Sequence, residues 1–178
     1  MPNSYSKNSA PSRRKTPATE FIVHPIPPFY NKGSRILILG SFPSVKSREQ
    51  GFFYGHPQNR FWKTLASVFG AGTPVTVGEK KEFLSAHNIA LWDVVRTCGI
   101  SGSADSKITN VTANDISPIL REANIEKIFV NGKKAYSLYC AYILPQTGRE
   151  AVCLPSTSPA NAAFGLEKLC AEWQKIKL

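Results

Sequence analysis

No apolar run in this 178-residue sequence approaches the roughly 18–20 residues of a membrane-spanning helix. The N-terminus also lacks the apolar stretch that follows the basic residues of a secretory signal peptide. We therefore expect a cytoplasmic protein with no membrane partner. Its hydrophobic fraction of 42% is sufficient for a buried core.

Cysteine is sparse, and the four cysteines are scattered along the chain at Cys98, Cys140, Cys153 and Cys170. No C-x-x-C pair and no Cys/His cluster has the spacing of a zinc site. The pattern argues against a structural zinc, an iron–sulfur cluster or a disulfide framework, and it favours thiols in a reducing compartment. We expect no metal and no other cofactor.

Acidic residues are also few, because 12 Asp and Glu stand against 22 Lys and Arg, for a net charge of +10. Such an excess suits a polyanionic partner, of which nucleic acid is the commonest. Simple solubility is the alternative explanation. Charge alone therefore indicates nucleic acid as a partner without identifying it.

The chain divides by composition into two parts. Residues 1–19 are mostly Ser, Pro, Asn, Lys and Arg, which predicts a disordered basic tail. Residues 20–178 have the length and apolar content of a single domain.

Short apolar strands alternate with amphipathic segments after residue 34. We expect strands at 36–40, 89–95, 128–130 and 151–154, and helices at 59–69, 79–87, 115–124, 133–143 and 163–175. Asn114 or Thr112 is the expected N-cap of the third helix. This order predicts an α/β three-layer sandwich, with a central, mostly parallel four-stranded sheet and helices on both faces. Ligands of such folds bind beyond the carboxyl ends of the strands.

Several common catalytic motifs are missing. The sequence has no G-x-G-x-x-G after its first strand, no complete phosphate loop, no G-x-S-x-G nucleophile elbow and no zinc-deaminase pattern. What remains at the strand ends is a set of polar loops without a strong nucleophile. Such loops can still orient a water molecule and stabilise a leaving group, which is sufficient to hydrolyse the N-glycosidic bond of a nucleotide.

Three segments carry a more specific signal. Residues 56–62 read His-Pro-x-Asn-Arg-Phe-Trp, residues 40–44 read Gly-Ser-Phe-Pro-Ser, and residues 154–161 read Leu-Pro-Ser-Thr-Ser-Pro-Ala-Asn. Together they resemble the uracil-DNA glycosylase superfamily, over roughly residues 34–175. The overall pattern is most similar to the hypoxanthine-DNA glycosylase branch, which is related to the mismatch-specific uracil and thymine glycosylases.

The resemblance implies a monofunctional DNA glycosylase of base excision repair, which flips a deaminated base and releases hypoxanthine from deoxyinosine. Its partner would be double-stranded DNA containing such a base, and a monomer associated with the nucleoid in a prokaryote is the simplest expectation. The alternatives are a uracil or thymine mismatch DNA glycosylase and a non-catalytic damaged-DNA-binding protein.

The implied catalytic residues are asparagines. The mismatch branch has a water-positioning Asn in its first loop, where this sequence has Phe42. In the hypoxanthine branch the Asn of the His-Pro-x-Asn segment replaces it, which makes Asn59 the main catalytic candidate and Asn131 the second. Asn59 could instead cap a helix and Asn131 could be a turn residue. A carboxylate, Asp93 or Asp105, remains an alternative for activating the water.

The resemblance also implies the binding residues. Base-binding candidates are the backbone amides of Ser41 and Phe42 and the ring of Tyr54, which would stack on the flipped base. The minor-groove candidates are Pro155, Ser156, Thr157, Ser158, Pro159 and Asn161. Lys46 and Arg60 are expected to contact phosphates, with a buried structural pairing as the alternative for Arg60.

Overall fold

The computed structural model describes residues 20–100 and 108–178, so the basic tail and Asp105 lie outside the described residues. Its main element is a four-stranded parallel sheet in the order β3-β2-β6-β7. These strands are β2 (Ile36–Gly40), β3 (Ile89–Asp93), β6 (Lys127–Asn131) and β7 (Ala151–Leu154). The predicted parallel sheet and its flanking helices are therefore confirmed.

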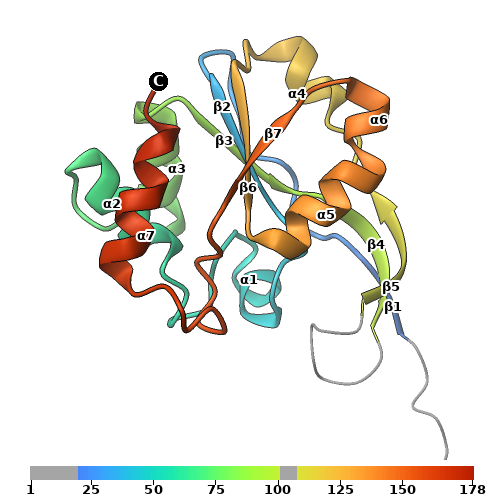
Figure 1. The fold of residues 1–178 in the computed structure, drawn as a ribbon, viewed down its shortest axis with the longest axis horizontal. Coiled ribbons are helices and arrows are strands. Elements are labelled where there is room, and N and C mark those ends of the chain that lie inside the picture. The colour runs from blue at the N-terminus through green and yellow to red at the C-terminus, as the bar shows by residue number, and fades with distance from the viewer. Residues whose placement is uncertain (1–19, 101–107) are drawn as a thin grey trace, which may run out of the picture.

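The alternation of side chains along β2 divides the core into two layers. Ile36 and Ile38 face one cluster of buried residues, which is completed by α2 (Phe61–Phe69), α3 (Val77–Ala86) and α7 (Leu166–Trp173). Leu37 and Leu39 face a second cluster, formed with α4 (Ser117–Glu122) and α5 (Lys133–Tyr142). The two groups of helices cover opposite faces of the sheet (Figure 1). All five residues of β2 are buried, as expected for a strand covered on both faces.

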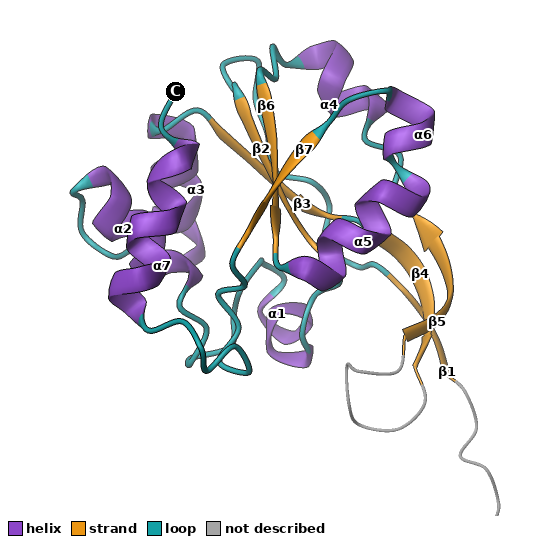
Figure 2. Cartoon of the chain, viewed as in Figure 1, coloured by secondary structure: helices purple, strands orange, loops and turns teal. Residues whose placement is uncertain are grey.

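A second, antiparallel sheet lies beside the first and was not predicted (Figure 2). It has the order β1-β4-β5, with β1 (Glu20–Val23), β4 (Val95–Ile100) and β5 (Ile108–Ala113). The prediction of one strand over 89–95 is wrong, because the chain leaves the parallel sheet after Asp93 and enters the antiparallel one at Val95. Apolar content cannot reveal this change because both strands are buried at this point.

Asn114 stabilises the junction between the two sheets and does not cap the helix that follows it. Its amide Nδ2 donates to the carbonyls of Asp93 and Val95, at 2.9 and 3.1 Å. The first turn of α4 is satisfied by Asp115, whose Oδ1 accepts from the Ser117 amide at 2.9 Å. The predicted cap at Asn114 or Thr112 is therefore wrong, because the buried Asn114 amide is used between the sheets.

Three short helical segments were also missed. They are α1 (Val45–Gln50), α6 (Leu144–Thr147) and a final 3-10 turn (Gln174–Ile176). α1 begins where the Ser44 hydroxyl accepts from the Ser47 amide, and it ends at Gly51, whose φ of 65° is left-handed. Segments of this length have too few residues to display a helical apolar period.

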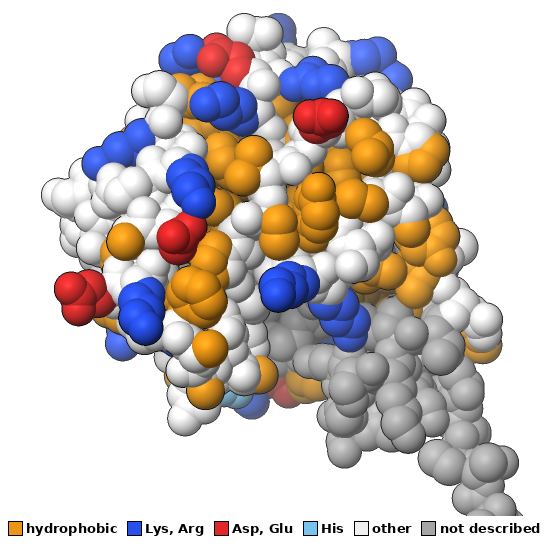
Figure 3. All heavy atoms as spheres, viewed as in Figure 1, with side chains coloured by type: hydrophobic (Ala, Val, Ile, Leu, Met, Phe, Trp, Pro, Cys, Tyr) orange, Lys and Arg blue, Asp and Glu red, His pale blue; other side chains and the backbone are white. Residues whose placement is uncertain are grey.

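Within the described ranges, no helix is long and apolar enough to cross a membrane. No disulfide joins the four cysteines. Across the same part of the chain, no group of three or more His, Cys, Asp or Glu side chains could hold a metal ion. Lys and Arg side chains are spread over the face drawn in Figure 3, where few acidic side chains are visible.

Candidate active site

A cavity of about 930 Å³ opens at the carboxyl ends of the parallel strands. Its walls come from residues 40–44 after β2, Asp93 at the end of β3, residues 131–135 after β6, and residues 153–161 around the end of β7. Asn59 and Tyr54, from the segment before α2, complete it. The cavity therefore brings together all three segments on which the resemblance rests, as expected for an open α/β sheet.

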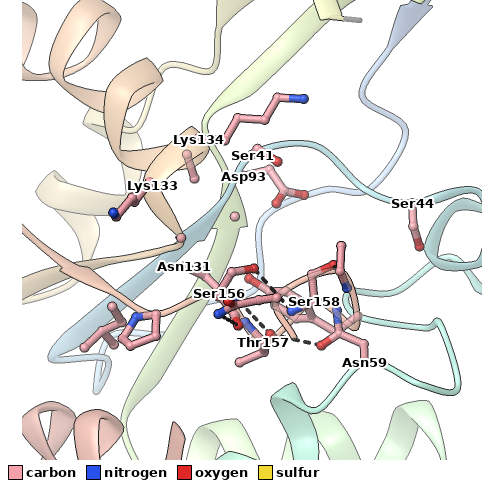
Figure 4. Close-up of a pocket in the computed structure, with 18 of the residues that line it drawn as sticks. Ser41, Ser44, Asn59, Asp93, Asn131, Lys133, Lys134, Ser156, Thr157 and Ser158 are labelled. Atoms are coloured by element: carbon pink, nitrogen blue, oxygen red, sulfur yellow. Dashed lines mark hydrogen bonds between the residues drawn. The ribbon is translucent and has the colours of Figure 1, made fainter. Parts of the chain in front are cut away.

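A chain of hydrogen bonds joins the two predicted catalytic asparagines through Thr157 (Figure 4). The Asn131 amide Nδ2 donates to the Thr157 hydroxyl at 2.9 Å, and that hydroxyl donates to Asn59 Oδ1 at 3.0 Å. The backbone amide of Thr157 donates in turn to Asn131 Oδ1, at 3.0 Å. Residues far apart in the sequence are thus held as one unit on one side of the cavity.

This network fixes which end of the Asn59 side chain remains available. Oδ1 accepts from the Thr157 hydroxyl and also from the Phe61 backbone amide, at 3.0 Å each. Two donors use the two lone pairs of the oxygen. Nδ2 has no hydrogen-bond partner among the described residues, so Asn59 presents N–H donors to the cavity. Asn59 also supports the first turn of α2, so the structural and functional interpretations of this residue are compatible.

The loop after β6 packs closely against the loop after β7, which brings Asn131 and Thr157 together. Gly132, between β6 and α5, has a φ of 96°, and its amide donates to the Leu154 carbonyl at 2.8 Å. A Cβ at this position would lie 2.9 Å from the Ser156 Cβ. Only glycine fits both the backbone conformation and the space, which explains the Asn131-Gly132 pair that the sequence places after the third predicted strand.

Arg60 organises the loop that follows β7. Its guanidinium donates to the backbone carbonyls of Thr157, Ser158, Asn161 and Phe164. These contacts occupy most of its N–H groups inside the protein. We therefore revise the expectation that Arg60 contacts a DNA phosphate, in favour of the structural alternative.

The loop at 155–161 has a buried base and an exposed tip. Thr157 is fully buried, so its side chain bridges the two asparagines and does not face a DNA groove, contrary to expectation. Asn161 Nδ2 donates to the Ser156 carbonyl at 2.9 Å, and the Trp173 indole donates to the Pro155 carbonyl at 3.0 Å. Pro159 and Ala160 are exposed at the tip, where a small apolar wedge would be placed.

Tyr54 contributes to the wall of the cavity from an unusual backbone conformation. Its φ is 52°, and its ring stacks on Phe61 with the centroids 3.8 Å apart, so one face of the ring is already covered. Its hydroxyl is buried and has no hydrogen bond of normal geometry among the described residues. Burial and, to a lesser extent, the Asp93 carboxylate raise the pKa of Tyr54, which therefore keeps its proton at neutral pH.

Asp93 and His24 form a buried pair that sequence reasoning identified only in part. Asp93 is one of the two predicted alternative carboxylates, and it lines the cavity with 4% of its surface exposed. Its Oδ2 lies 2.8 Å from His24 Nε2. His24 was not expected at the site, because it precedes the fold's first parallel strand in a Pro-rich segment that has no motif. Only the spatial path of that segment brings it there.

The remaining predicted residues lie around the cavity. Ser41 and Phe42 line it, and the Phe42 ring meets the His24 ring edge-on with the centroids 5.6 Å apart. Lys46 is exposed on α1 and pairs with Glu49 at 2.8 Å. Lys133 and Lys134 are exposed at the start of α5, where they line the cavity (Figure 4).

Comparison with known proteins agrees with this geometry. The sequence profile of the uracil DNA glycosylase superfamily matches residues 27–177. The chain belongs to this superfamily. A protein of Methanosarcina acetivorans named hypoxanthine DNA glycosylase is 35% identical over 152 residues, which covers 84% of this chain and 94% of that protein. A protein of the same name from Methanosarcina barkeri is 36% identical over 138 residues, covering 76% and 85% respectively.

A solved structure has the same fold. The solution NMR structure of a candidate uracil DNA glycosylase from Methanosarcina acetivorans superposes with a TM-score of 0.73 at 33% identity. The match covers 85% of this chain and 93% of the other. The predicted family and the α/β fold are therefore confirmed, and the superfamily assignment makes DNA the substrate polymer.

Proposed function

We propose that this protein is a monofunctional DNA glycosylase that releases hypoxanthine from deoxyinosine in double-stranded DNA. The observation that carries the proposal is the Asn59–Thr157–Asn131 unit in the strand-end cavity, in a chain whose relatives are named hypoxanthine DNA glycosylase. We expect it to act as a monomer in the cytoplasm, where it removes a deaminated base as the first step of base excision repair.

Asn59 is proposed to hold the attacking water. Because its Oδ1 is occupied, its free Nδ2 donates to one lone pair of the water and leaves the other directed at the sugar. An amide cannot remove the proton of the water near neutral pH. Glycosidic bonds break through an oxocarbenium-like transition state, in which the sugar is already a strong electrophile, so positioning alone accelerates the reaction.

Asn131 is proposed to contact the base that leaves. Its Oδ1 accepts one hydrogen bond from Thr157 and its Nδ2 donates one to the same residue, so each atom retains capacity for a further hydrogen bond. An amide with both a donor and an acceptor suits a purine edge. The bridge through Thr157 keeps Asn131 and Asn59 at a fixed separation, so the base and the water are positioned together.

The surroundings of the cavity suit DNA with a flipped base. Flipping leaves a gap in the duplex, and the exposed Pro159 and Ala160 are placed to fill it from the minor groove. Lys46, Lys133 and Lys134 are exposed near the cavity and can contact phosphates. The Lys46–Glu49 pair costs little to break because both side chains are exposed.

A uracil glycosylase remains the second candidate, because the superposed solution structure carries a uracil glycosylase title. The test uses matched duplexes that contain one deoxyinosine, one deoxyuridine or no lesion, and it measures the free base that is released. We expect release of hypoxanthine and none from the undamaged duplex. Release of uracil alone would overturn the proposed substrate, and salt-sensitive binding without release of any base would favour a damage-binding protein.

A further inference from the structure

The Asp93 carboxylate is held in a defined orientation by His24. The backbone amide of Ile26 donates to His24 Nδ1 at 3.2 Å, so Nδ1 is an acceptor and the ring proton is on Nε2. Nε2 therefore donates to Asp93 Oδ2, at 2.8 Å. The two side chains are only 2% and 5% exposed, which protects this hydrogen bond from competition by water.

The other oxygen of the carboxylate has no partner. Asp93 Oδ1 makes no hydrogen bond within the described part of the chain, although it borders the cavity. It fills the space beside Gly40, where a Cβ would stand 2.2 Å from it and 3.0 Å from the Tyr54 hydroxyl. That hydroxyl is itself buried without a hydrogen bond of normal geometry, and it lies within reach of both the Asp93 carboxylate and the Asn131 side chain. An acceptor and a hydroxyl thus lie close together against the end of β2.

A side chain that is only 5% exposed and lines a cavity with one carboxylate oxygen unpartnered indicates a ligand with a complementary donor, because polar groups withdrawn from water are normally hydrogen-bonded. A carboxylate only accepts hydrogen bonds, whereas a neutral tyrosine can donate one. The complement is an N–H next to a C=O, which is the lactam edge of hypoxanthine and also of uracil. Adenine and cytosine present a bare ring nitrogen beside an amino group, which reverses the pattern.

Resting on the proposed function, we infer that Asp93 is the specificity-determining residue of the base pocket: its Oδ1 accepts the ring N–H of a deaminated base and repels the ring nitrogen lone pair of the amino parent. His24 is the positioning residue that holds Oδ2. Guanine shares the lactam edge and differs by its 2-amino group, so its exclusion depends on another part of the pocket.

The position of Asp93 favours recognition of the base over activation of water. The Asp93 carboxylate is not a member of the hydrogen-bond chain of Asn59, Thr157 and Asn131 that Figure 4 draws with dashed lines. A carboxylate that activated water would change the rate of base release equally for every base. A carboxylate that reads the base edge would change which base is bound. Affinity for uncleaved DNA separates these two roles.

The test measures the affinity of wild type and Asp93→Asn for duplexes that contain 2′-fluoro nucleosides, whose glycosidic bonds resist cleavage. In one pair of duplexes, one duplex contains 2′-fluoro-inosine and the other contains 2′-fluoro-adenosine. In the second pair, one duplex contains the 2′-fluoro nucleoside of uracil and the other contains that of cytosine. Asp115→Asn makes the same change on an exposed carboxylate outside the cavity and serves as the matched control. Thermal unfolding of each variant reports whether the fold is retained.

We expect wild type and Asp115→Asn to prefer the deaminated member of a pair. Asp93→Asn directs an amide N–H at the base, and the preference falls on the order of 10- to 100-fold, the range for a hydrogen bond to a charged group. His24→Gln should reduce the preference less, and the double variant should lose no more than Asp93→Asn, because His24 acts through Asp93.

The outcomes separate this inference from the proposed function. A preference for the uracil nucleoside alone, lost in Asp93→Asn, supports the role of Asp93 and overturns hypoxanthine as the substrate. A wild-type protein with no preference in either pair overturns the inference. So does an Asp93→Asn protein that keeps the wild-type preference, even if it releases bases more slowly.

Discussion

At the scale of single residues, the site depends on Thr157. One hydroxyl accepts a hydrogen bond from Asn131 and donates one to Asn59, and only Ser or Thr can do both in this space. The residue is fully buried, so water cannot replace either contact. Its position in a Pro-Ser-Thr-Ser-Pro segment gave no sign of this, because such segments are typical of exposed loops.

Replacing Thr157 by Val should therefore impair both stability and activity. The change keeps the shape of the side chain but leaves Asn59 and Asn131 with unsatisfied groups, which should lower the free energy of unfolding by about 1–3 kcal/mol. Chemical denaturation measures this effect, and single-turnover kinetics should show slower base release. Thr157→Ser keeps the hydroxyl and should retain most of the activity. Equal activity of the Val and Ser variants would contradict the bridging role.

At the scale of elements, the segment before α2 and the loop after β7 form one unit through Arg60. Its guanidinium joins carbonyls from Thr157 to Phe164 and so holds the base of the loop while Pro159 and Ala160 remain exposed. A rigid base allows the exposed tip to enter DNA without first becoming ordered, which lowers the entropic cost of binding.

Arg60→Gln should weaken DNA binding without changing its dependence on salt. The loop loses its anchor, but no phosphate contact is lost, so a plot of log affinity against log salt concentration keeps its slope. Lys133→Gln is the comparison, because it removes an exposed cation at the edge of the cavity and should reduce that slope by roughly one unit. If Arg60→Gln reduces the slope by the same amount, Arg60 binds phosphate after all.

Sequence alone predicted the elements whose signal is local. β2 and β6 are short continuous apolar runs, and α2 has a clear helical period, so their existence followed from periodicity. The antiparallel sheet was missed because its strands pair across long separations, such as β1 with β4. The bulges in the pairing of β4 with β5 further obscure their alternation.

For the candidate site too, sequence alone predicted the residues that lie in local motifs and missed those whose roles depend on distant contacts. Asn59 and Asn131 could be named because they lie in motifs that resemble those of a family. The roles of Arg60, Thr157 and His24 depend on partners 26 to 104 positions away along the chain. No local sequence pattern predicts such contacts, and they are seen only in the folded structure.

At the scale of the whole molecule, the fold brings the four strand ends to one cavity, and the composition gives the chain an excess of positive charge. The net charge of +10 favours association with any DNA, and the phosphate contacts carry no information about sequence or damage. Selection of damage must therefore come from flipping and from the groups inside the cavity. A deaminated base in a mispair flips at lower cost, so the duplex itself contributes to selection.

The central claim is that Asn59, held by Thr157, positions the water that releases hypoxanthine. Its most direct test is the single-turnover rate of hypoxanthine release from an inosine-containing duplex, for wild type and Asn59→Ala. Asn124→Ala, which removes an exposed asparagine away from the cavity, is the matched control. We predict that wild type and Asn124→Ala release the base at similar rates and that Asn59→Ala is slower by on the order of 100-fold. Release by Asn59→Ala at the wild-type rate would contradict the account.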